Sequence, residues 1–395
     1  MIDNNITNKK KAHVLIIPSW YPLYSGDIGG SFFREQAIAL HSAGFSVGVI
    51  FPQLRSFKKL FESFNGVTKE IDGGVTTYRD GFINFTPRCK TLMQKKWLKK
   101  GERLFKLYIK EHGKPDIIHA HSLFNGGLLA HLLSKKYKVP FVITEHSTAF
   151  SRGLISNKQI SEAQSAIKDA NSCIAVSNEF KTLLNQKLNT DKWIYIPNIV
   201  SNDFLESKLI SNCNKNYRFI NICLLEPKKK VDILIHAFYI LSQKVDNIEL
   251  EIGGNGSQFN YLMNLVSELG LDDKIKFHGK LTRTEVLSKV SNADAFVLSS
   301  EFETFGVVLV EALALGIPVI ATKCGGPESI VTPEVGFLVE KNSSAALAEA
   351  MFFLHSNSKN YKASDIRSYC YKEFSQDTVI RRLTDTYNSI ITNYE

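Results

Sequence analysis

Cysteine is scarce in this chain, and the spacing of its cysteines argues against two kinds of cysteine site. The 395 residues include six cysteines, and none forms a Cys-x-x-Cys pair. This argues against a zinc ribbon and against the disulfide framework of a small secreted protein. Reduced thiols in a cytosolic protein fit better.

Long apolar runs are also missing. The best candidate, residues 305–321, is interrupted by a glutamate, a glycine and a proline, whereas a membrane-spanning helix needs about 20 apolar residues. Near the N-terminus, three lysines precede only four apolar residues, 14–17, whereas a secretory signal needs about 7–15. We therefore expect neither a transmembrane helix nor a secretory signal.

Acidic residues are few in the first half. The formal net charge is +9; residues 1–200 carry 28 Lys and Arg against 15 Asp and Glu, and the remainder carries 20 against 24. Nine basic residues lie between Lys90 and Lys114, with apolar and aromatic residues at helical spacing. Such a segment suits an anionic membrane surface, and the alternative is a solvated helix that packs on its own domain. Nucleic acid is not expected, because no recognition motif accompanies the charge.

The length and the order of apolar segments predict two α/β domains. Short apolar runs alternate with helix-like stretches, which is typical of parallel sheets covered by helices on both faces. We expect strands at 14–18, 47–52, 116–120, 141–144, 173–176, 193–197, 219–225, 248–253, 275–278, 295–299 and 318–322. Helices are expected at 33–43, 123–137, 161–169, 177–187, 231–243, 258–269, 284–291, 306–315, 345–355 and 377–391.

The predicted fold is therefore a pair of doubly wound, Rossmann-like domains that face each other across a cleft. The first spans 12–198, a polar linker spans 199–216, and the second spans 217–375. Residues 376–395 form a C-terminal helix expected to return toward the first domain. Ligands of such sheets bind beyond the carboxyl ends of the strands, so the cleft is the expected site.

Residues 299–326 carry the most chemical information. A strand is followed by a loop with Glu303, and a helix starts near Gly306, where free amides suit a phosphate. Glu311 is the only charge on that apolar helix, and a buried carboxylate needs a partner. Two carboxylates beside a helix start suit a molecule with a sugar at each end of a diphosphate. Alternatively, Glu311 bonds a neighbouring backbone group and Glu303 is merely solvated.

This block resembles the signature of family-4 glycosyltransferases of the GT-B fold. The resemblance rests on Glu303, Glu311, the run Gly-Ile-Pro-Val-Ile-Ala-Thr at 316–322 and the pair Gly325-Gly326. Other segments match the family in order: Ser-Trp-Tyr-Pro at 19–22, residues 29–36, Pro-Asp-Ile-Ile-His-Ala-His at 115–121, Thr-Glu-His at 144–146, Ile-Pro-Asn at 196–198, Gly-Gly-Asn-Gly at 253–256 and Phe-His-Gly at 277–279.

The resemblance implies retaining transfer of a hexose-type sugar from a nucleotide diphosphate sugar to a hydroxyl. Glu303 would contact the donor hexose, Glu311 the ribose, Lys229 the diphosphate, and His146 the transferred sugar. Gly30 would let its loop approach the distal phosphate. The remaining donor-binding residues that the resemblance implies are Thr304, Phe305, Gly306, Val307 and His278. Neither a metal nor another cofactor is expected, since family members work without one and the chain has no Asp-x-Asp.

One position departs from the family pattern. Residues 223–230 read Cys-Leu-Leu-Glu-Pro-Lys-Lys-Lys, so Leu224 replaces the usual arginine that grips the diphosphate together with Lys229. Lys228 or Lys230 could compensate for the lost contact. A non-catalytic protein that binds nucleotide sugars is therefore a second hypothesis.

We expect the acceptor to be a lipid-linked saccharide or glycolipid in bacterial-type surface polysaccharide synthesis, such as lipopolysaccharide or capsule. This expectation rests on the basic first half and on the acceptors that are usual in the family that the chain resembles. The protein would then be cytoplasmic and peripheral on the inner face of the membrane. A soluble sugar acceptor, or epimerisation of a nucleotide sugar, is possible within the same fold.

Other polar residues allow two interpretations each. His119 and His121 fit buried structural histidines better than ligands of the cleft. Glu145 either orients His146 or caps a turn, and Glu328 is a further candidate for the donor pocket. A nicotinamide site is not expected, because the turn at 253–256 lacks a third glycine and an acidic ribose reader.

Overall fold

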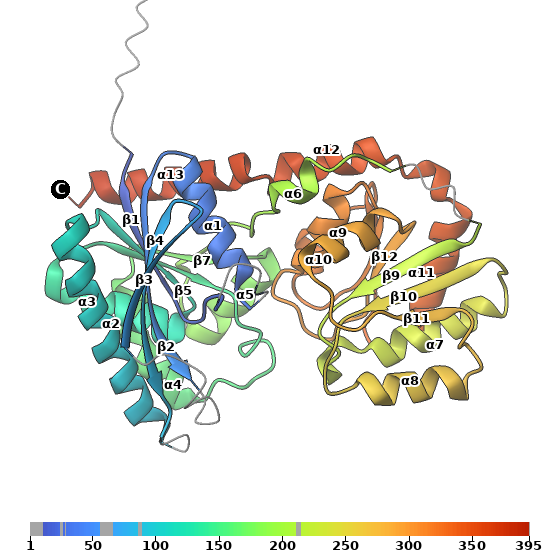
Figure 1. Ribbon diagram of the computed structural model, residues 1–395, viewed down its shortest axis with the longest axis horizontal. Helices are drawn as coiled ribbons and strands as arrows, with labels where there is room; N and C mark the ends of the chain where they lie inside the picture. The colour runs from blue at the N-terminus through green and yellow to red at the C-terminus, as the bar shows by residue number, and fades with distance from the viewer. Residues whose placement is uncertain are drawn as a thin grey trace, which may run out of the picture. The chain divides into compact units, whose positions relative to one another are not determined.

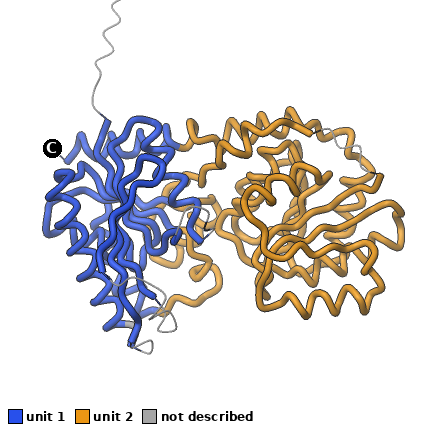
Figure 2. Tube along the Cα trace, in the orientation of Figure 1, with its two compact units in different colours: residues 1–145, 157–174, 380–395 blue, residues 146–156, 175–379 orange. Residues whose placement is uncertain are grey.

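The computed structural model describes residues 11–23, 27, 29–55, 66–85, 89–210 and 215–394. The chain divides into two compact units (Figure 2). Unit 1 contains residues 1–145, 157–174 and 380–395, and unit 2 contains residues 146–156 and 175–379. Residues 211–214 of the predicted linker, Cys213 included, lie outside the described residues. Within the described ranges, no helix is both long and apolar enough to span a bilayer.

The larger sheet has eight strands in the order β3-β4-β2-β1-β5-β6-β7-β8 (Figure 1). β4, β2, β1, β5 and β6 run parallel, and the apolar runs predict each of these strands except β4. The strands are β1 (His13–Pro18), β2 (Ser46–Arg55), β3 (Gly66–Asp72), β4 (Val75–Ile83), β5 (Ile117–His121), β6 (Phe141–Glu145), β7 (Ser172–Ala175) and β8 (Trp193–Tyr195). The accompanying helices are α1 (Ser31–Ser42), α2 (Lys90–His112), α3 (Leu128–Tyr137), α4 (Asn157–Asp169) and α5 (Asn178–Leu188).

The hairpin of β3 and β4 is absent from the strands expected from the sequence. β3 pairs with β4 in the antiparallel direction, and Asp72 faces Val75 at the turn. Gly73 and Gly74 both have positive φ, 56° and 81°, as a two-residue hairpin turn that matches the strand twist requires. The Gly-Gly pair between two alternating segments was the signal for this hairpin.

Helix α2 packs its apolar side on the larger sheet. Its buried side chains include Trp97, Leu104, Phe105 and Tyr108. The contact is close, because a Cβ at Gly48 on β2 would lie 2.2 Å from the ring of Tyr108. The helical spacing of the basic segment is therefore confirmed, and its apolar side is covered by the sheet.

The second sheet has six strands in the order β11-β10-β9-β12-β13-β14, all parallel. The strands are β9 (Tyr217–Ile222), β10 (Ile248–Gly253), β11 (Ile275–Phe277), β12 (Ala295–Leu298), β13 (Val319–Thr322) and β14 (Gly336–Val339). The helices of unit 2 include α6 (Asn202–Leu205), α7 (Val231–Ser242), α8 (Phe259–Glu268), α9 (Arg283–Ser291), α10 (Val307–Ala314), α11 (Ser344–Ser356) and α12 (Ala363–Phe374).

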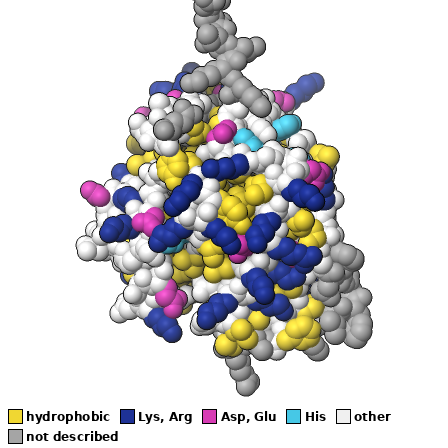
Figure 3. Space-filling model, turned by 90° about the vertical axis from the view of Figure 1, so that its left-hand side faces the viewer, with side chains coloured by type: hydrophobic (Ala, Val, Ile, Leu, Met, Phe, Trp, Pro, Cys, Tyr) yellow, Lys and Arg dark blue, Asp and Glu magenta, His cyan; other side chains and the backbone are white. Residues whose placement is uncertain are grey.

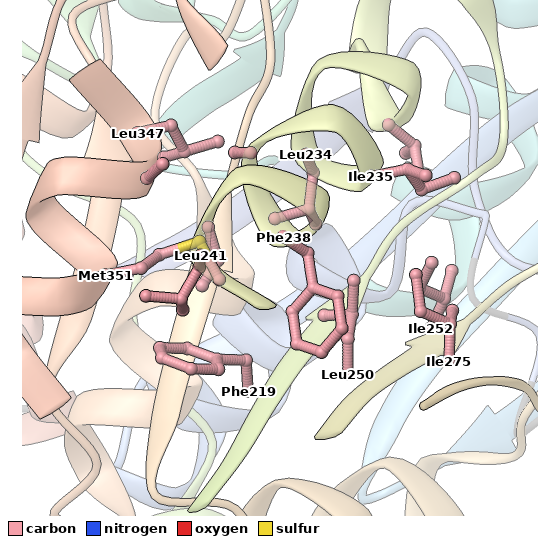
Figure 4. Packing of buried hydrophobic residues seen from close by; sticks show 14 of the residues in the cluster. Phe219, Leu234, Ile235, Phe238, Leu241, Leu250, Ile252, Ile275, Leu347 and Met351 are labelled. Atoms are coloured by element: carbon pink, nitrogen blue, oxygen red, sulfur yellow. The ribbon is translucent and has the colours of Figure 1, made fainter. Parts of the chain in front are cut away.

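The core of unit 2 lies between this sheet and three helices. Leu234 and Phe238 of α7 and Met351 of α11 point toward Phe219 and Leu250 of the sheet (Figure 4). All five are fully buried. Burial of each large apolar side chain stabilises the fold by about 1.5–3 kcal/mol, so this packing holds the carboxyl ends of β9 and β12 in fixed positions.

The last helix, α13 (Gln376–Thr392), begins in unit 2 and continues into unit 1. Tyr387 on this helix is fully buried, and its hydroxyl lies 2.6 Å from Nδ1 of His119 on β5. Its ring also packs edge-on against Phe45. The C-terminal helix is thus part of the first unit's core.

Candidate active site

The loop after β12 contains Glu303, whose carboxylate is held by two side chains. Oε1 lies 2.5 Å from Nζ of Lys229 and accepts a hydrogen bond of 2.9 Å from the hydroxyl of Ser300. The Glu303 side chain is only 12% exposed. The structure therefore brings together two residues that are 74 positions apart, and Glu303 is not merely solvated.

Lys229 lies on a short turn, Pro227–Lys229, between β9 and α7. Its side chain is 17% exposed. Burial opposes its charge, but the nearby Glu303 outweighs that effect, so the pKa of Lys229 lies above its ordinary value. The side chain is therefore a cation at neutral pH and can neutralise an anionic ligand.

Two further hydrogen bonds fasten the lysine turn to the glutamate loop. The hydroxyl of Ser299 donates to the carbonyl of Lys229 at 2.9 Å, and the amide of Glu301 donates to the carbonyl of Lys228 at 2.8 Å. Such contacts hold the first shell of a site in a fixed geometry. Both loops follow the carboxyl ends of neighbouring strands, where ligands of parallel sheets bind.

A glycine pair lets a third loop approach the same segment. A Cβ on Gly326 would lie 2.4–2.6 Å from backbone atoms of Phe305, which is closer than real contacts allow. Gly325 has φ 111°, and its amide donates to both carboxylate oxygens of Glu328 at 3.0 and 3.1 Å. Glu328, a candidate for the donor pocket, therefore holds the glycine turn in the structure.

Helix α10 starts directly after Gly306, which has φ 107°. Only glycine adopts this backbone conformation without strain. The first amides of a helix, here from Val307 onward, have no acceptor within the helix and form a site that favours anions. Gly306 thus sets the direction from which α10 leaves the loop that contains Glu303.

Glu311 lies on α10 and is paired with a cation that sequence reasoning missed. Its Oε1 lies 3.0 Å from Nη1 of Arg283, the first residue of α9. Burial raises the pKa of Glu311, and the charge of Arg283 opposes this shift. The guanidinium also stacks over the ring of Phe204 at 4.9 Å. The carboxylate without a partner on α10 was the only signal in the sequence for such a cation.

His146 lies in a segment of unit 2 that is tied to the same loop. The hydroxyl of Thr304 donates to the backbone carbonyl of His146 at 2.9 Å, and both residues are buried. Farther along, the hydroxyl of Ser177 donates to the carbonyl of Gly325 at 2.8 Å. The first bond brings the backbone of His146 beside Thr304, the residue that follows Glu303.

His278 contacts a different carboxylate, and Gly30 belongs to the other unit. His278 follows β11, and its Nε2 lies 2.8 Å from Oε2 of the buried Glu251. Gly30 belongs to unit 1, where it precedes α1 with φ 84°. A Cβ there would lie 3.0 Å from the ring of Trp20, so a side chain at this position would press on the tryptophan.

The position that departs from the family pattern is open to solvent. Leu224 is 58% exposed. Lys228, half-buried, has a pKa lowered by its burial and by the charges of Lys229 and Arg152. Lys230 has φ 50° and pairs with Glu301 at 3.5 Å. Lys228 is thus crowded by two other cations, and an anionic ligand would relieve that repulsion.

The histidines of β5 have structural contacts. His119 is fully buried between Tyr387 and Thr144, and its pKa is lowered to about 3 by burial. His121, also buried, stacks on it at 4.3 Å. Glu145 accepts the amide of Leu123 at 2.7 Å, so it caps a neighbouring turn.

The thiols near Glu303 do not supply a nucleophile. Burial raises the pKa of Cys223 and of Cys324 to about 12 each. All five cysteines in the described ranges are free of disulfides. In the part of the chain that the structure describes, there is also no group of three His, Cys, Asp or Glu side chains that could hold a metal ion.

Comparison with known proteins identifies the family. Residues 29–204 match the model of Glycosyltransferase Family 4, and residues 206–372 match the model of Glycosyl transferases group 1. An uncharacterized glycosyltransferase of Methanocaldococcus jannaschii is 29% identical over 304 residues, which cover 76% of this chain and 81% of the relative.

Solved structures share the fold. Sucrose-phosphate synthase from Thermosynechococcus elongatus superposes with a TM-score of 0.76 at 19% identity, over 96% of this chain and all of that chain. Anabaena HepE, in complex with UDP and glucose, superposes with a TM-score of 0.71 at 21% identity, again over 96% of this chain and all of that chain. The two matched models and the two parallel-sheet units show that the chain belongs to the group 1 glycosyltransferases of the GT-B fold, with a family-4-like first half.

Proposed function

We propose that this glycosyltransferase moves a hexose-type sugar from a nucleotide diphosphate sugar to a hydroxyl acceptor, with retention of configuration and without a metal. The observation that carries the proposal is the contact of Glu303 with Lys229 and Ser300 beside the start of α10. A carboxylate can accept hydrogen bonds from sugar hydroxyls, and the adjacent cation and helix amides can hold phosphates.

The chemical step requires stabilisation of the diphosphate as it leaves. Negative charge develops on its oxygens, and Lys229 with the first amides of α10 would neutralise that charge without reorganising. Glu303 would orient the hexose, and Glu311 would contact the ribose. We name no protein nucleophile, because retention is usually described with the leaving phosphate acting as the base on the front face.

Lys228 is the residue we propose to compensate for Leu224. It lies next to Lys229 and is half-buried, and its pKa is lowered first by burial and then by the charges of Lys229 and Arg152. A bound diphosphate would relieve that repulsion. Lysine is a point charge and lacks the planar fork of arginine, so we expect a weaker grip than in relatives that keep the arginine.

The acceptor we propose is a lipid-linked saccharide or glycolipid used in surface polysaccharide synthesis, and the protein would act in the cytoplasm on the membrane's inner face. The support is the excess of basic residues in the first half of the chain. The alternative is a glycosyltransferase with a soluble acceptor. One structural neighbour, sucrose-phosphate synthase, is named for a product that is a sugar phosphate.

A second candidate function is a non-catalytic protein that binds nucleotide sugars, which the exposed Leu224 favours. A panel of UDP-, GDP-, ADP- and dTDP-sugars, with and without a chelator, tests donor binding through thermal stabilisation. Ligand at a hundredfold excess over Kd stabilises the folded state by about 2.7 kcal/mol. A chelator-insensitive shift with one base supports the donor site, and release of the free nucleotide with an acceptor distinguishes transfer from binding alone. No shift with any sugar would contradict both functions.

A further inference from the structure

The outward face of α2 carries an unbroken row of cations. Its exposed basic residues follow one another at spacings of three and four positions, which places them on a single side of the helix. They are Lys95, Lys99, Arg103, Lys106 and Lys110, here called the α2 stripe. At a rise of 1.5 Å per residue the stripe is about 22 Å long.

Two basic residues of α2 outside the stripe contact the sheet. Lys100 pairs with the fully buried Asp80 at 2.8 Å, and Lys96 lies over the ring of Phe82 at 5.3 Å. Within the stripe, Arg103 reaches Asp80 at 3.5 Å and Lys106 reaches Glu102 at 3.4 Å. No described carboxylate pairs with the other three. The structure thus separates the segment into lysines that hold it to the sheet and cations that face solvent.

A row of like charges destabilises a helix in solution. Residues at i and i+4 are neighbours on the helix surface, and like charges at that spacing repel. The exposed charged positions of α13 show the usual alternative, since Asp377, Arg381 and Asp385 alternate in sign at the same spacing. The charges of the α2 stripe do not alternate in sign, and only Arg103 and Lys106 of its five cations contact a described carboxylate. An anionic surface would compensate the charges of the other three.

Apolar side chains lie beside the cations. Leu92 is 50% exposed on the same side of α2, and Phe85, just before the helix, is 61% exposed. Lys135, Lys136 and Lys138 at the end of α3 are exposed as well, and Lys136 pairs with Glu102 of α2 at 2.5 Å. Figure 3 shows Lys and Arg side chains gathered on a face of the first unit, with apolar side chains between them and few acidic ones.

We propose that the α2 stripe docks on an anionic lipid bilayer, with Leu92 and Phe85 entering the interfacial layer. Cations on one side of a helix together with exposed apolar side chains at its end suit a flat lipid surface. Helix α2 follows the carboxyl end of β4, so docking would bring that edge of the sheet, where ligands of such folds bind, near the lipid. The inference rests on the proposed lipid-linked acceptor and names the surface that would reach it.

The test measures cosedimentation of the full chain with vesicles of phosphatidylcholine, alone and mixed equally with phosphatidylglycerol. We expect binding only to the mixed vesicles, weakened by salt. The triple variant Lys95→Gln, Lys99→Gln, Lys110→Gln should lose about a hundredfold in partitioning, at about fivefold per charge. The control Lys187→Gln, Lys244→Gln, Lys372→Gln removes the same charge from exposed positions elsewhere and should bind like the wild type.

Equal losses in both triple variants, or no loss in the first, would overturn the proposal. Binding of transfer RNA at least as tight as binding of mixed vesicles, with the same dependence on the stripe, would overturn it in favour of nucleic acid. Thermal stabilisation by the nucleotide sugar is measured on the same variants. It should not change, so failure of the docking surface and failure of the donor site are distinguishable.

Discussion

Nζ of Lys229 lies 2.5 Å from Oε1 of Glu303, so the cation and the carboxylate expected to contact a donor sugar contact each other. Each neutralises the other in a largely buried place. When a diphosphate binds, its charge would compete with Glu303 for the lysine, and the carboxylate would become available to sugar hydroxyls. Loss of either partner should therefore affect donor binding and transfer more than folding.

The variant Glu303→Gln should lose sugar transfer by at least about a hundredfold while the protein stays folded. The amide keeps the shape of the side chain but has only one oxygen acceptor and no charge, and removing one group that stabilises the transition state costs about 10²–10³ in rate. Initial rates with a saturating donor measure the loss, and circular dichroism checks the fold. Glu301→Gln, two positions away and paired with Lys230, is the matched control. Equal activity of both variants would contradict the role of Glu303.

Removal of Arg283 should destabilise the fold more than removal of its partner's charge. Arg283→Met leaves the carboxylate of Glu311, 7% exposed, without its cation, which we expect to cost about 3 kcal/mol. Glu311→Gln leaves a guanidinium that is 30% exposed and can reach water. We expect this variant to lose about 1 kcal/mol of unfolding free energy. Urea unfolding at pH 7 measures both.

The pH dependence provides an independent check on the Arg283→Met variant. Burial already raises the pKa of Glu311, and loss of Arg283 raises it further, so the folded state binds a proton more readily than the unfolded state. The deficit in unfolding free energy should therefore shrink as the pH falls from 7 to 5. A deficit independent of pH would indicate lost packing on Phe204 instead.

Restoring the arginine at position 224 should strengthen nucleotide binding. Leu224 is exposed, so Leu224→Arg requires no repacking, and a charge-assisted bidentate contact should tighten UDP or another selected nucleotide about tenfold. Lys228→Gln should weaken binding by a similar factor, and Lys244→Gln, distant in sequence and exposed, should not change it. Isothermal titration measures all three. Unchanged affinity in the first two variants would show that neither position contacts the diphosphate.

His119 should make the fold sensitive to acid. Its pKa is lowered to about 3 by burial, whereas the unfolded value is about 6.5. Between these values the unfolded state binds a proton that the folded state does not, so stability is lost as the pH falls. The free energy of unfolding should decrease by about 2.5 kcal/mol between pH 6 and pH 4 through this residue.

The matched variant for this prediction is His119→Gln. It is expected to be less stable at pH 7, because the contacts with Tyr387 and Thr144 are altered. Its stability should nevertheless fall less between pH 6 and pH 4, and the difference from the wild type in urea unfolding measures the contribution of His119. Parallel curves would mean that the histidine is already protonated in the folded protein.

Much of the architecture could be predicted from the sequence because parallel strands that are buried on both faces are continuous apolar runs. Residues 14–18 and 295–298 are fully or nearly fully buried and match expected strands. The β3–β4 hairpin was missed because polar residues hide the pattern of both strands. β3 is largely exposed and contains Lys69 and Glu70, whereas β4 is almost entirely buried but contains Arg79 and Asp80. Turn chemistry, not hydrophobicity, marked that hairpin.

The candidate site likewise has features that the sequence predicts and features that it does not. Glycines required by a sharp turn or a close approach, such as Gly306 and Gly326, are visible in the sequence because few other residues fit there. The cationic partners of Glu303 and Glu311 were not visible, because Lys229 and Arg283 reach them from 74 and 28 positions away through tertiary packing. Sequence spacing identifies which groups need a partner, and only the fold shows which residue supplies it.

The burial of Tyr387 in the first unit has a consequence for synthesis of the chain. A ribosome releases His119 and Phe45 long before Tyr387 of α13, which follows His119 by 268 positions. Domains usually fold as units in order of emergence, but this unit stays incomplete until α13 has been made. Its exposed apolar surface in nascent chains would make it a target for chaperones, and premature termination would leave it open to proteolysis.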